Sequence, residues 1–308
     1  MWPIKNILVL GAGELGTQIL LSLAQHPALS SKTSISVLLR PSSIASPSPS
    51  KAAELEKLKA NNITFVPCDI SISSQSTLSS LFSSYDTVIS ATGFSAGRGT
   101  QLKLAKAVLD AGIPRYIPWQ FGVDYDVIGR GSAQDLFDEQ LDVRDLLRSQ
   151  SNTKWVIIST GMFTSFLFER AFGVVDAENG VVTALGSWEN RVTVTAPVDI
   201  GRVTAEVALG ESFGDADDGV VYVAGDTVSY GRVAEIVEGV TGRIFGRRVR
   251  TVEDAKRELA RETENGLFKY QVVFGEGRGV AWDVEETWNA QRGMRLQTAE
   301  EWARENLV

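Results

Sequence analysis

An apolar strand, a glycine-rich turn and the start of a helix follow one another at the beginning of this sequence, and this order strongly limits the fold. The strand Ile4–Leu10 runs into a turn that contains Gly11, Gly13 and Gly16. In such turns the first glycine permits the bend, the second lets the backbone approach a pyrophosphate, and the third lets the helix pack against the strand. Free N–H groups at the helix start attract the anion. The segment therefore predicts a dinucleotide-binding site.

A second signal for a cofactor follows the next predicted strand, Ile35–Leu39. This strand ends at Arg40, where a site selective for NAD carries Asp or Glu to bind the ribose 2′-hydroxyl. A carboxylate there would repel the 2′-phosphate of NADP, whereas an arginine attracts it. Arg40 therefore predicts NADPH as the cofactor, with an ordinary surface arginine as the alternative. The Ser/Pro-rich segment from Pro41 to Ser50 is expected to form a loop.

Strands and helices alternate through the first half of the chain, with helices predicted between successive strands. The further strands are predicted at Ile63–Val66, Thr87–Ser90, Arg115–Pro118 and Trp155–Ser159. Repeated strand–helix units imply an α/β fold with a doubly wound parallel sheet. We expect a Rossmann domain over residues 1–160 and a smaller, mixed substrate-binding domain over residues 161–308, from which some segments return to the Rossmann sheet. Within the second domain, residues 181–186 and 191–195 suggest a hairpin.

Ligands of such sheets bind at the carboxyl ends of the strands, so the residues there are candidates for the site. Asp69 follows the third strand and is expected either to meet the adenine edge or to cap the next helix. The small residues Ala91, Thr92 and Gly93 follow the fourth strand and leave room for a cofactor. The remaining cofactor-binding candidates lie at the start of the first helix and after the fifth strand: Glu14, Leu15, Gln120 and Phe121.

Charge and composition exclude several other classes of function. A net charge of -8 argues against nucleic-acid binding, and the basic cluster of Arg243, Arg247, Arg248 and Arg250 is expected to form a solvated strand edge. No apolar run is long enough to cross a bilayer. The single cysteine and the single histidine (His26, expected to close the first helix) predict no metal site. We expect a cytoplasmic monomer or homodimer.

Several of these residues together resemble the NmrA-like, isoflavone-reductase-like family of atypical short-chain dehydrogenases. The resemblance rests on the glycine turn, on Arg40, on the Trp-Gln-Phe-Gly-Val-Asp loop at 119–124, on Thr160-Gly161-Met162-Phe163 and on Asp199-Ile200-Gly201-Arg202. It implies a Rossmann domain with a small C-terminal substrate domain. It also implies that members which are enzymes use NADPH to reduce phenolic or phenylpropanoid-type compounds, whereas other members bind the dinucleotide as a regulatory signal.

Two departures from the family pattern bear on catalysis. No tyrosine has a lysine four residues later, and the position three residues after Phe137, where the reductases carry a catalytic lysine, is Gln140. A glutamine amide can hydrogen-bond to a carbonyl oxygen but cannot transfer a proton. The proton must then come from another group near the loop after the fifth strand, for which Asp124 and Tyr125 are candidates. A solvated loop or helix face is the alternative for each.

Aromatic and apolar side chains at two neighbouring strand ends predict a pocket for a flat substrate. The substrate-binding candidates are Trp119, Gly122, Met162, Phe163 and Phe166, although core packing explains any one of them equally well. Three functions remain open. The first is an NADPH-dependent reductase of an aromatic, phenolic or conjugated carbonyl compound. The second is a non-catalytic NADP(H)-binding redox sensor, and the third is a non-redox isomerase or cyclase acting on a polyketide-like compound of secondary metabolism.

Overall fold

The computed structural model describes residues 4–210, 213 and 219–307, which form two compact units. Each unit is built from segments that are separate in the sequence. The first unit contains the described residues of Met1–Gln120, Asp142–Ile158 and Ile200–Val221. The second contains those of Phe121–Leu141, Ser159–Asp199 and Tyr222–Val308. In the described part of the chain, no helix has the length and apolar character that a bilayer crossing requires.

The first unit is built on a six-stranded sheet with the order β3-β2-β1-β4-β5-β6. All neighbouring strands in it are parallel, which confirms the predicted doubly wound α/β fold. The strands are β1 (Asn6–Leu10), β2 (Ser34–Leu39), β3 (Ile63–Pro67), β4 (Thr87–Ser90), β5 (Arg115–Ile117) and β6 (Lys154–Trp155). Their apolar runs suit a sheet that is covered on both faces.

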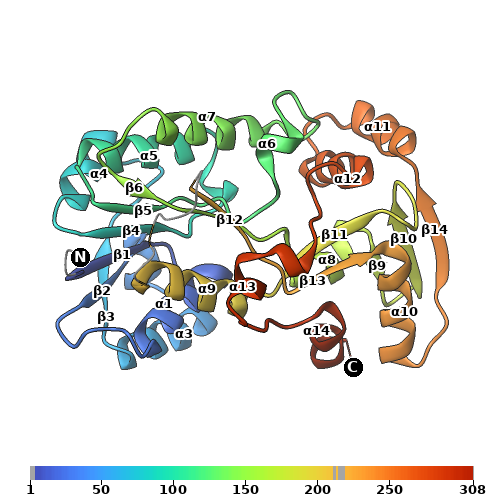
Figure 1. Cartoon of the computed structure of the whole chain (residues 1–308), viewed down its shortest axis with the longest axis horizontal. Coiled ribbons are helices and arrows are strands. Elements are labelled where there is room, and N and C mark those ends of the chain that lie inside the picture. Colours follow the sequence, from blue (N-terminus) through green and yellow to red (C-terminus); the bar gives the residue numbers. More distant parts are fainter. Residues whose placement is uncertain (1–3, 211–212, 214–218, 308) are drawn as a thin grey trace. The chain divides into compact units, whose positions relative to one another are not determined.

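Helices cover both faces of this sheet (Figure 1). On one face lie α4 (Gln75–Phe82), α5 (Thr100–Asp110) and the C-terminal part of α7 (Leu136–Arg148), and on the other lie α1 (Glu14–Gln25), α3 (Pro49–Ala60) and α9 (Pro197–Leu209). Leu8 and Val88 of the sheet belong to a buried cluster that also contains Phe82 of α4, Leu104 of α5 and Leu147 of α7. His26 follows the last residue of α1, as predicted.

The Ser/Pro-rich segment after Arg40 is helical, so the prediction of a loop there is wrong. It forms α2 (Pro41–Ala45) and the first turn of α3, each of which begins with a proline. Proline suits the first helical position because its ring fixes a helical φ and its missing N–H has no helical partner there. The Ser48 hydroxyl then caps α3 by accepting from the backbone N–H of Lys51 at 3.3 Å. The serine- and proline-rich composition of the segment did not indicate where these two helices begin.

The second unit contains two three-stranded sheets, and the predicted hairpin of residues 181–186 and 191–195 is wrong. The first segment is β10 (Val181–Leu185), which lies between β14 (Gly246–Arg250) and β9 (Val175–Asp176). The second is β11 (Arg191–Thr195), which lies between β13 (Asp226–Ser229) and β8 (Met162–Phe163). Apolar alternation identifies a strand but does not select its partner. The arginine-rich strand β14 is an exposed sheet edge, as predicted.

The remaining elements follow or connect these sheets. Strands β7 (Ile157–Ser159) and β12 (Val220–Tyr222) form a two-stranded sheet. The helices are α6 (Tyr125–Ile128), α8 (Thr164–Phe168), α10 (Tyr230–Thr241), α11 (Val252–Arg261), α12 (Gly266–Glu276), α13 (Trp288–Gln291) and α14 (Ala299–Asn306), with 3₁₀ turns at Phe94–Ala96, Arg170–Phe172 and Val284–Glu286.

A buried asparagine fixes the C-terminal part of the second unit. The Asn289 side chain of α13 accepts from the N–H of Ala224 and donates to the carbonyl of the same residue, both at 3.1 Å. It also donates to the carbonyl of Met294 at 3.3 Å. Buried backbone groups require such partners, because water does not reach them. Asn289 therefore holds α13 to the backbone that follows β12.

We expect Asn289→Ala to lower the free energy of unfolding by about 2–4 kcal/mol, because it removes three hydrogen bonds to backbone groups. Two of these are at the buried residue Ala224. Urea-induced unfolding followed by tryptophan fluorescence measures this change. The control is Asn179→Ala, which removes one exposed side-chain hydrogen bond to Asp176 and is expected to change stability by about 0.5 kcal/mol or less. Equal effects of the two substitutions would contradict the role given to Asn289.

Candidate functional site

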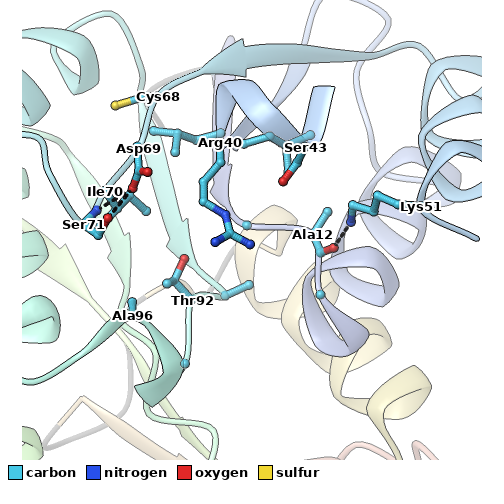
Figure 2. Close-up of a pocket in the computed structure, with 16 residues that line it drawn as sticks. Ala12, Arg40, Ser43, Lys51, Cys68, Asp69, Ile70, Ser71, Thr92 and Ala96 are labelled. Atoms are coloured by element: carbon cyan, nitrogen blue, oxygen red, sulfur yellow. Dashed lines mark hydrogen bonds between the residues drawn. The ribbon is translucent and has the colours of Figure 1, made fainter. Parts of the chain in front are cut away.

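A cavity of about 480 Å³ opens in the first unit at the carboxyl ends of β1, β2, β3 and β4 (Figure 2). This is the edge at which open parallel sheets bind their ligands. Of the residues predicted to bind a cofactor, Gly11, Gly13, Arg40, Asp69, Ala91, Thr92 and Gly93 line it. It is also lined by nine further residues: Ala12, Leu38, Leu39, Ser43, Lys51, Cys68, Ile70, Ser71 and Ala96.

The glycine turn has the geometry that its sequence predicts. Gly11 has a φ of +95°, in the region that favours glycine, and its N–H donates to the carbonyl of Leu38 at 3.1 Å. Gly13 has open space where a Cβ would stand, so its backbone is accessible from the cavity. A Cβ on Gly16 would strike the carbonyl oxygen of Gly11. Gly16 therefore permits the close packing of α1 on the turn, and Gly13 leaves the turn open to a ligand.

Two cations reach this cavity from different elements. Arg40 directly follows β2 and is exposed, and Figure 2 shows its side chain extending into the cavity. Lys51 lies in the first turn of α3, on the opposite side of Arg40 from Asp69 (Figure 2), and its ammonium donates to the carbonyl oxygen of Ala12. Ser43 of α2 adds a hydroxyl to the lining. Two positive charges and a hydroxyl suit a phosphate group.

Sequence reasoning missed Lys51 because it treated the preceding residues as a loop. A usable signal was nevertheless present. A lysine in the first turn of a helix is unfavourable, because the helix dipole places partial positive charge there. Once Pro49 is recognised as the first residue of α3, Lys51 stands at a helix position that lysine does not favour. Such exceptions to local preference often mark functional residues.

Asp69 makes a local turn with Ser71 and does not cap the next helix. Its Oδ1 accepts from the backbone N–H of Ser71 at 2.9 Å and from the Ser71 hydroxyl at 2.6 Å. These two hydrogen bonds lower the pKa of the Asp69 carboxyl below its usual value. The cap of α4 is the hydroxyl of Ser74. The helix-cap alternative for Asp69 is therefore wrong, whereas its contact with an adenine edge stays a prediction.

The other predicted cofactor residues do not line this cavity. Glu14 and Leu15 lie in the first turn of α1, and Leu15 is buried. The Gln120 side chain is also buried, and its Oε1 accepts from Nε of Arg144 at 2.8 Å within the first unit. Phe121 is the first residue of the second unit and is buried there. A position next to a strand end thus did not by itself place these side chains in the cavity.

The three predicted catalytic residues all belong to the second unit. Asp124 caps α6, since its Oδ1 accepts from the N–H of Val127 at 3.1 Å, and its Oδ2 accepts from the hydroxyl of Tyr222 at 2.7 Å. Tyr125 follows and is 2% exposed. Gln140 of α7 is fully buried. Both oxygens of Asp124 therefore have donors within the unit.

An aromatic cluster connects Tyr125 with α7 and α12. The Phe137 ring, one turn before Gln140 on α7, packs edge-to-face on Tyr125 with centroids 4.9 Å apart. On its other side Phe137 lies 5.8 Å from the ring of Tyr270. Burial raises the pKa of the Tyr270 hydroxyl far above its usual range, so that this group stays protonated. Sequence reasoning missed Tyr270, because nothing local indicates that α12 packs beside α7.

The predicted substrate residues divide between the two units. Trp119 belongs to the first unit, where its ring packs against Phe94 with centroids 4.6 Å apart. In the second unit Phe166 extends the aromatic cluster, since its ring lies 6.0 Å from that of Tyr270. The three others are also in the second unit. Met162 and Phe163 form strand β8, and the Gly122 carbonyl accepts from the backbone N–H groups of Thr160 and Gly161.

Fold and cavity together define this chain as a Rossmann-type α/β protein with a recess at its glycine turn. The sequence model of the NmrA-like family matches residues 3–303. The chain is 48% identical over 305 residues to an NmrA-like family domain-containing oxidoreductase of Gibberella moniliformis, covering 98% of this chain and 99% of that protein. The chain therefore belongs to the NmrA-like family, as its motifs predicted.

Solved structures of reductases share the fold along almost the whole chain. The complex of leucoanthocyanidin reductase with NADPH from Vitis vinifera superposes with a TM-score of 0.78 at 19% identity, covering 97% of this chain and 98% of that chain. Isoflavone reductase superposes with a TM-score of 0.77 at 17% identity, covering 99% and 100% of the two chains. At these identities the likeness concerns the fold.

Gly13 and Gly16 differ in the space around them, which allows a direct test of the packing of α1 on the glycine turn. We expect Gly16→Ala to lower the free energy of unfolding by about 1–3 kcal/mol, because its methyl group would strike the Gly11 carbonyl. Gly13→Ala meets open space and should change stability by about 0.5 kcal/mol or less. Thermal unfolding of both variants measures the difference, and an unaltered Gly16→Ala variant would argue against close packing of α1 on the turn.

Proposed function

We propose that this protein is an NADPH-dependent reductase of aromatic, phenolic or conjugated carbonyl compounds. The observation that carries the proposal is the cavity at the glycine turn, into which Arg40 extends and which Lys51 also lines. An oxidoreductase relative at 48% identity supports the same class of activity. The fold shared with a reductase solved as an NADPH complex agrees with the cofactor.

The cofactor assignment follows from the charges around the cavity. In this proposal Arg40, Lys51 and Ser43 hold the 2′-phosphate, and the backbone at Gly13 with the start of α1 holds the pyrophosphate. No carboxylate follows β2 directly, where it would favour the 2′-hydroxyl of NADH. Asp69 lines the cavity on the side of β3 and, being ionised, accepts a hydrogen bond from the adenine amino group. NADPH, when bound, supplies a hydride to the substrate.

In this proposal side chains of α6 and of α7 supply polarity and the proton. The Gln140 amide donates a hydrogen bond to the carbonyl oxygen of the substrate, and the Tyr125 hydroxyl provides the proton that balances the hydride. Phe137 packs on Tyr125 and lies one turn before Gln140, which supports their joint action. Asp124 acts as a positioning residue, because its oxygens hold the first turn of α6 and the hydroxyl of Tyr222. Phe166 and Tyr270 extend the aromatic cluster beside them, and we assign this surface to a flat substrate.

One observation favours a second candidate function, a redox-sensing regulator that binds NADP(H) without turnover. Gln140 stands where the resembling reductases carry a lysine, and an amide does not exchange protons with a substrate. NADPH oxidation with a panel of enones, quinones and aryl ketones separates the two. Turnover of any member supports the reductase. Tight NADPH binding without oxidation across the panel favours the regulator.

We expect Arg40→Ala to weaken NADPH binding about tenfold to a hundredfold, because a charge-assisted contact with the 2′-phosphate is lost. The affinity for NADH, which lacks this phosphate, should change much less. Isothermal titration with each cofactor measures both effects. Equal losses for the two cofactors would remove the 2′-phosphate from the role of Arg40.

We expect Gln140→Ala to lower kcat about a hundredfold while the Kd for NADPH is kept, because the variant removes a donor to the developing negative charge on oxygen. The matched control is Gln134→Ala, which removes another fully buried glutamine of the second unit, one that donates to the Gly266 carbonyl. The control should lower stability without a comparable loss of kcat. An unchanged rate in Gln140→Ala would exclude this side chain from the reaction.

A further inference from the structure

Lys51 is held in place by two partners. Its ammonium donates to the carbonyl oxygen of Ala12 and to Oε1 of Glu54, the latter at 2.7 Å. The Lys51 side chain is 22% exposed and that of Glu54 is 27% exposed, so the pair is partly shielded from water. An ammonium group carries three donors. Two point to Ala12 and Glu54, which leaves the third for a ligand in the cavity.

Glu54 stands behind Lys51 and does not itself line the cavity. The oxygen that accepts from Lys51 also accepts from the hydroxyl of Thr17 at 2.6 Å. Thr17 belongs to α1, whereas Glu54 and Lys51 belong to α3. The carboxylate therefore connects the two helices that carry the glycine turn and the cation.

The position of Lys51 in its helix makes this support necessary. The first turn of α3 contains no acidic residue, and a lysine there faces the partial positive charge of the helix N-terminus. A lysine side chain is also flexible and strongly hydrated, so without a fixed partner it would sample solvent. Glu54, one turn further along the helix, offsets both effects.

We propose that Glu54, supported by Thr17, is a positioning residue that sets the preference for NADPH by holding the Lys51 ammonium at the cavity wall, ready for the 2′-phosphate. This inference rests on the proposed binding of NADPH. Binding then requires little ordering of the lysine, and this preorganisation appears as affinity. The benefit is specific to the phosphate, because the 2′-hydroxyl of NADH has no charge for Lys51 to meet.

Glu54 also carries a negative charge, which by itself would repel a phosphate. That charge lies behind the ammonium, hydrogen-bonded to Lys51 and Thr17, and is partly exposed to solvent that screens it. The Lys51 ammonium lines the cavity and is therefore the nearer charge. We therefore expect the positioning of Lys51 by Glu54 to exceed the repulsion between Glu54 and the phosphate. Loss of the positioning weakens NADPH binding, whereas loss of the repulsion strengthens it.

The experiment compares wild type, Glu54→Gln and Lys51→Met by isothermal titration with NADPH and with NADH. Glutamine keeps an oxygen for the Thr17 hydroxyl but removes the charge that holds Lys51. We expect Glu54→Gln to raise the Kd for NADPH about threefold to tenfold and to leave the Kd for NADH unchanged. In the Lys51→Met background the same substitution should have no further effect, because Glu54 acts through Lys51.

The chain offers a matched control on the same helix. Glu56 and Lys59 form an ion pair with the same three-residue spacing and the same 2.7 Å distance, but both side chains are largely exposed, at 71% and 56%. Neither lines the cavity. Glu56→Gln should therefore change neither Kd. Thr17→Val, which removes only the hydroxyl donor to Glu54, should weaken NADPH binding in the same direction and by less.

An unchanged or lower Kd for NADPH in Glu54→Gln, or an equal loss for NADPH and NADH, would overturn the inference. So would a full effect of Glu54→Gln in the Lys51→Met background. The proposed function is tested separately by the wild type. If the wild type bound NADPH no more tightly than NADH, the cofactor assignment itself would fail, whatever the variants did. Thermal unfolding of each variant identifies any loss that comes from unfolding.

Discussion

The close approach of α1 to the backbone of the glycine turn is the contact on which the cavity at this turn depends. It is possible because Gly16 has no side chain where the Gly11 carbonyl passes, and because Gly11 adopts a φ of +95°. This packing aims the N-terminus of α1 at the space beyond β1. It also brings Thr17 of α1 to Glu54 of α3, and so helps to fix Lys51 beside the turn. One steric condition in the sequence thus affects both the geometry of the glycine turn and the position of a cation beside it.

The sequence predicted the first unit well because its signals are local. Strands β1 and β4 are short apolar runs, and α1 and α5, the next α-helices after them, each have a clear apolar face. The second unit was harder to predict, since β10 pairs with β14 and β11 with β13, strands that lie far along the chain. Register and partner in such sheets come from tertiary packing, which alternation in one segment does not contain.

The residues of the candidate site also divide into those that local sequence signals predicted and those that depend on tertiary packing. Arg40 and the glycines were predicted because their positions relative to β1 and β2 define their roles. Lys51 was missed because its place in the cavity depends on where α3 begins, and Tyr270 because α12 reaches α7 only in the folded unit. Asp69 shows the reverse case. The residue was predicted, but the structure replaces the expected helix cap by a turn with Ser71.

The residues proposed to recognise the cofactor lie in the first unit, whereas Asp124, Tyr125 and Gln140 lie in the second. In the proposed function, Gln140 can hydrogen-bond but cannot transfer a proton, while Arg40 and Lys51 supply the charges that recognise the cofactor. In the proposed function, recognition of NADPH and proton transfer therefore depend on different residues, so that the reaction can change while the cofactor is kept.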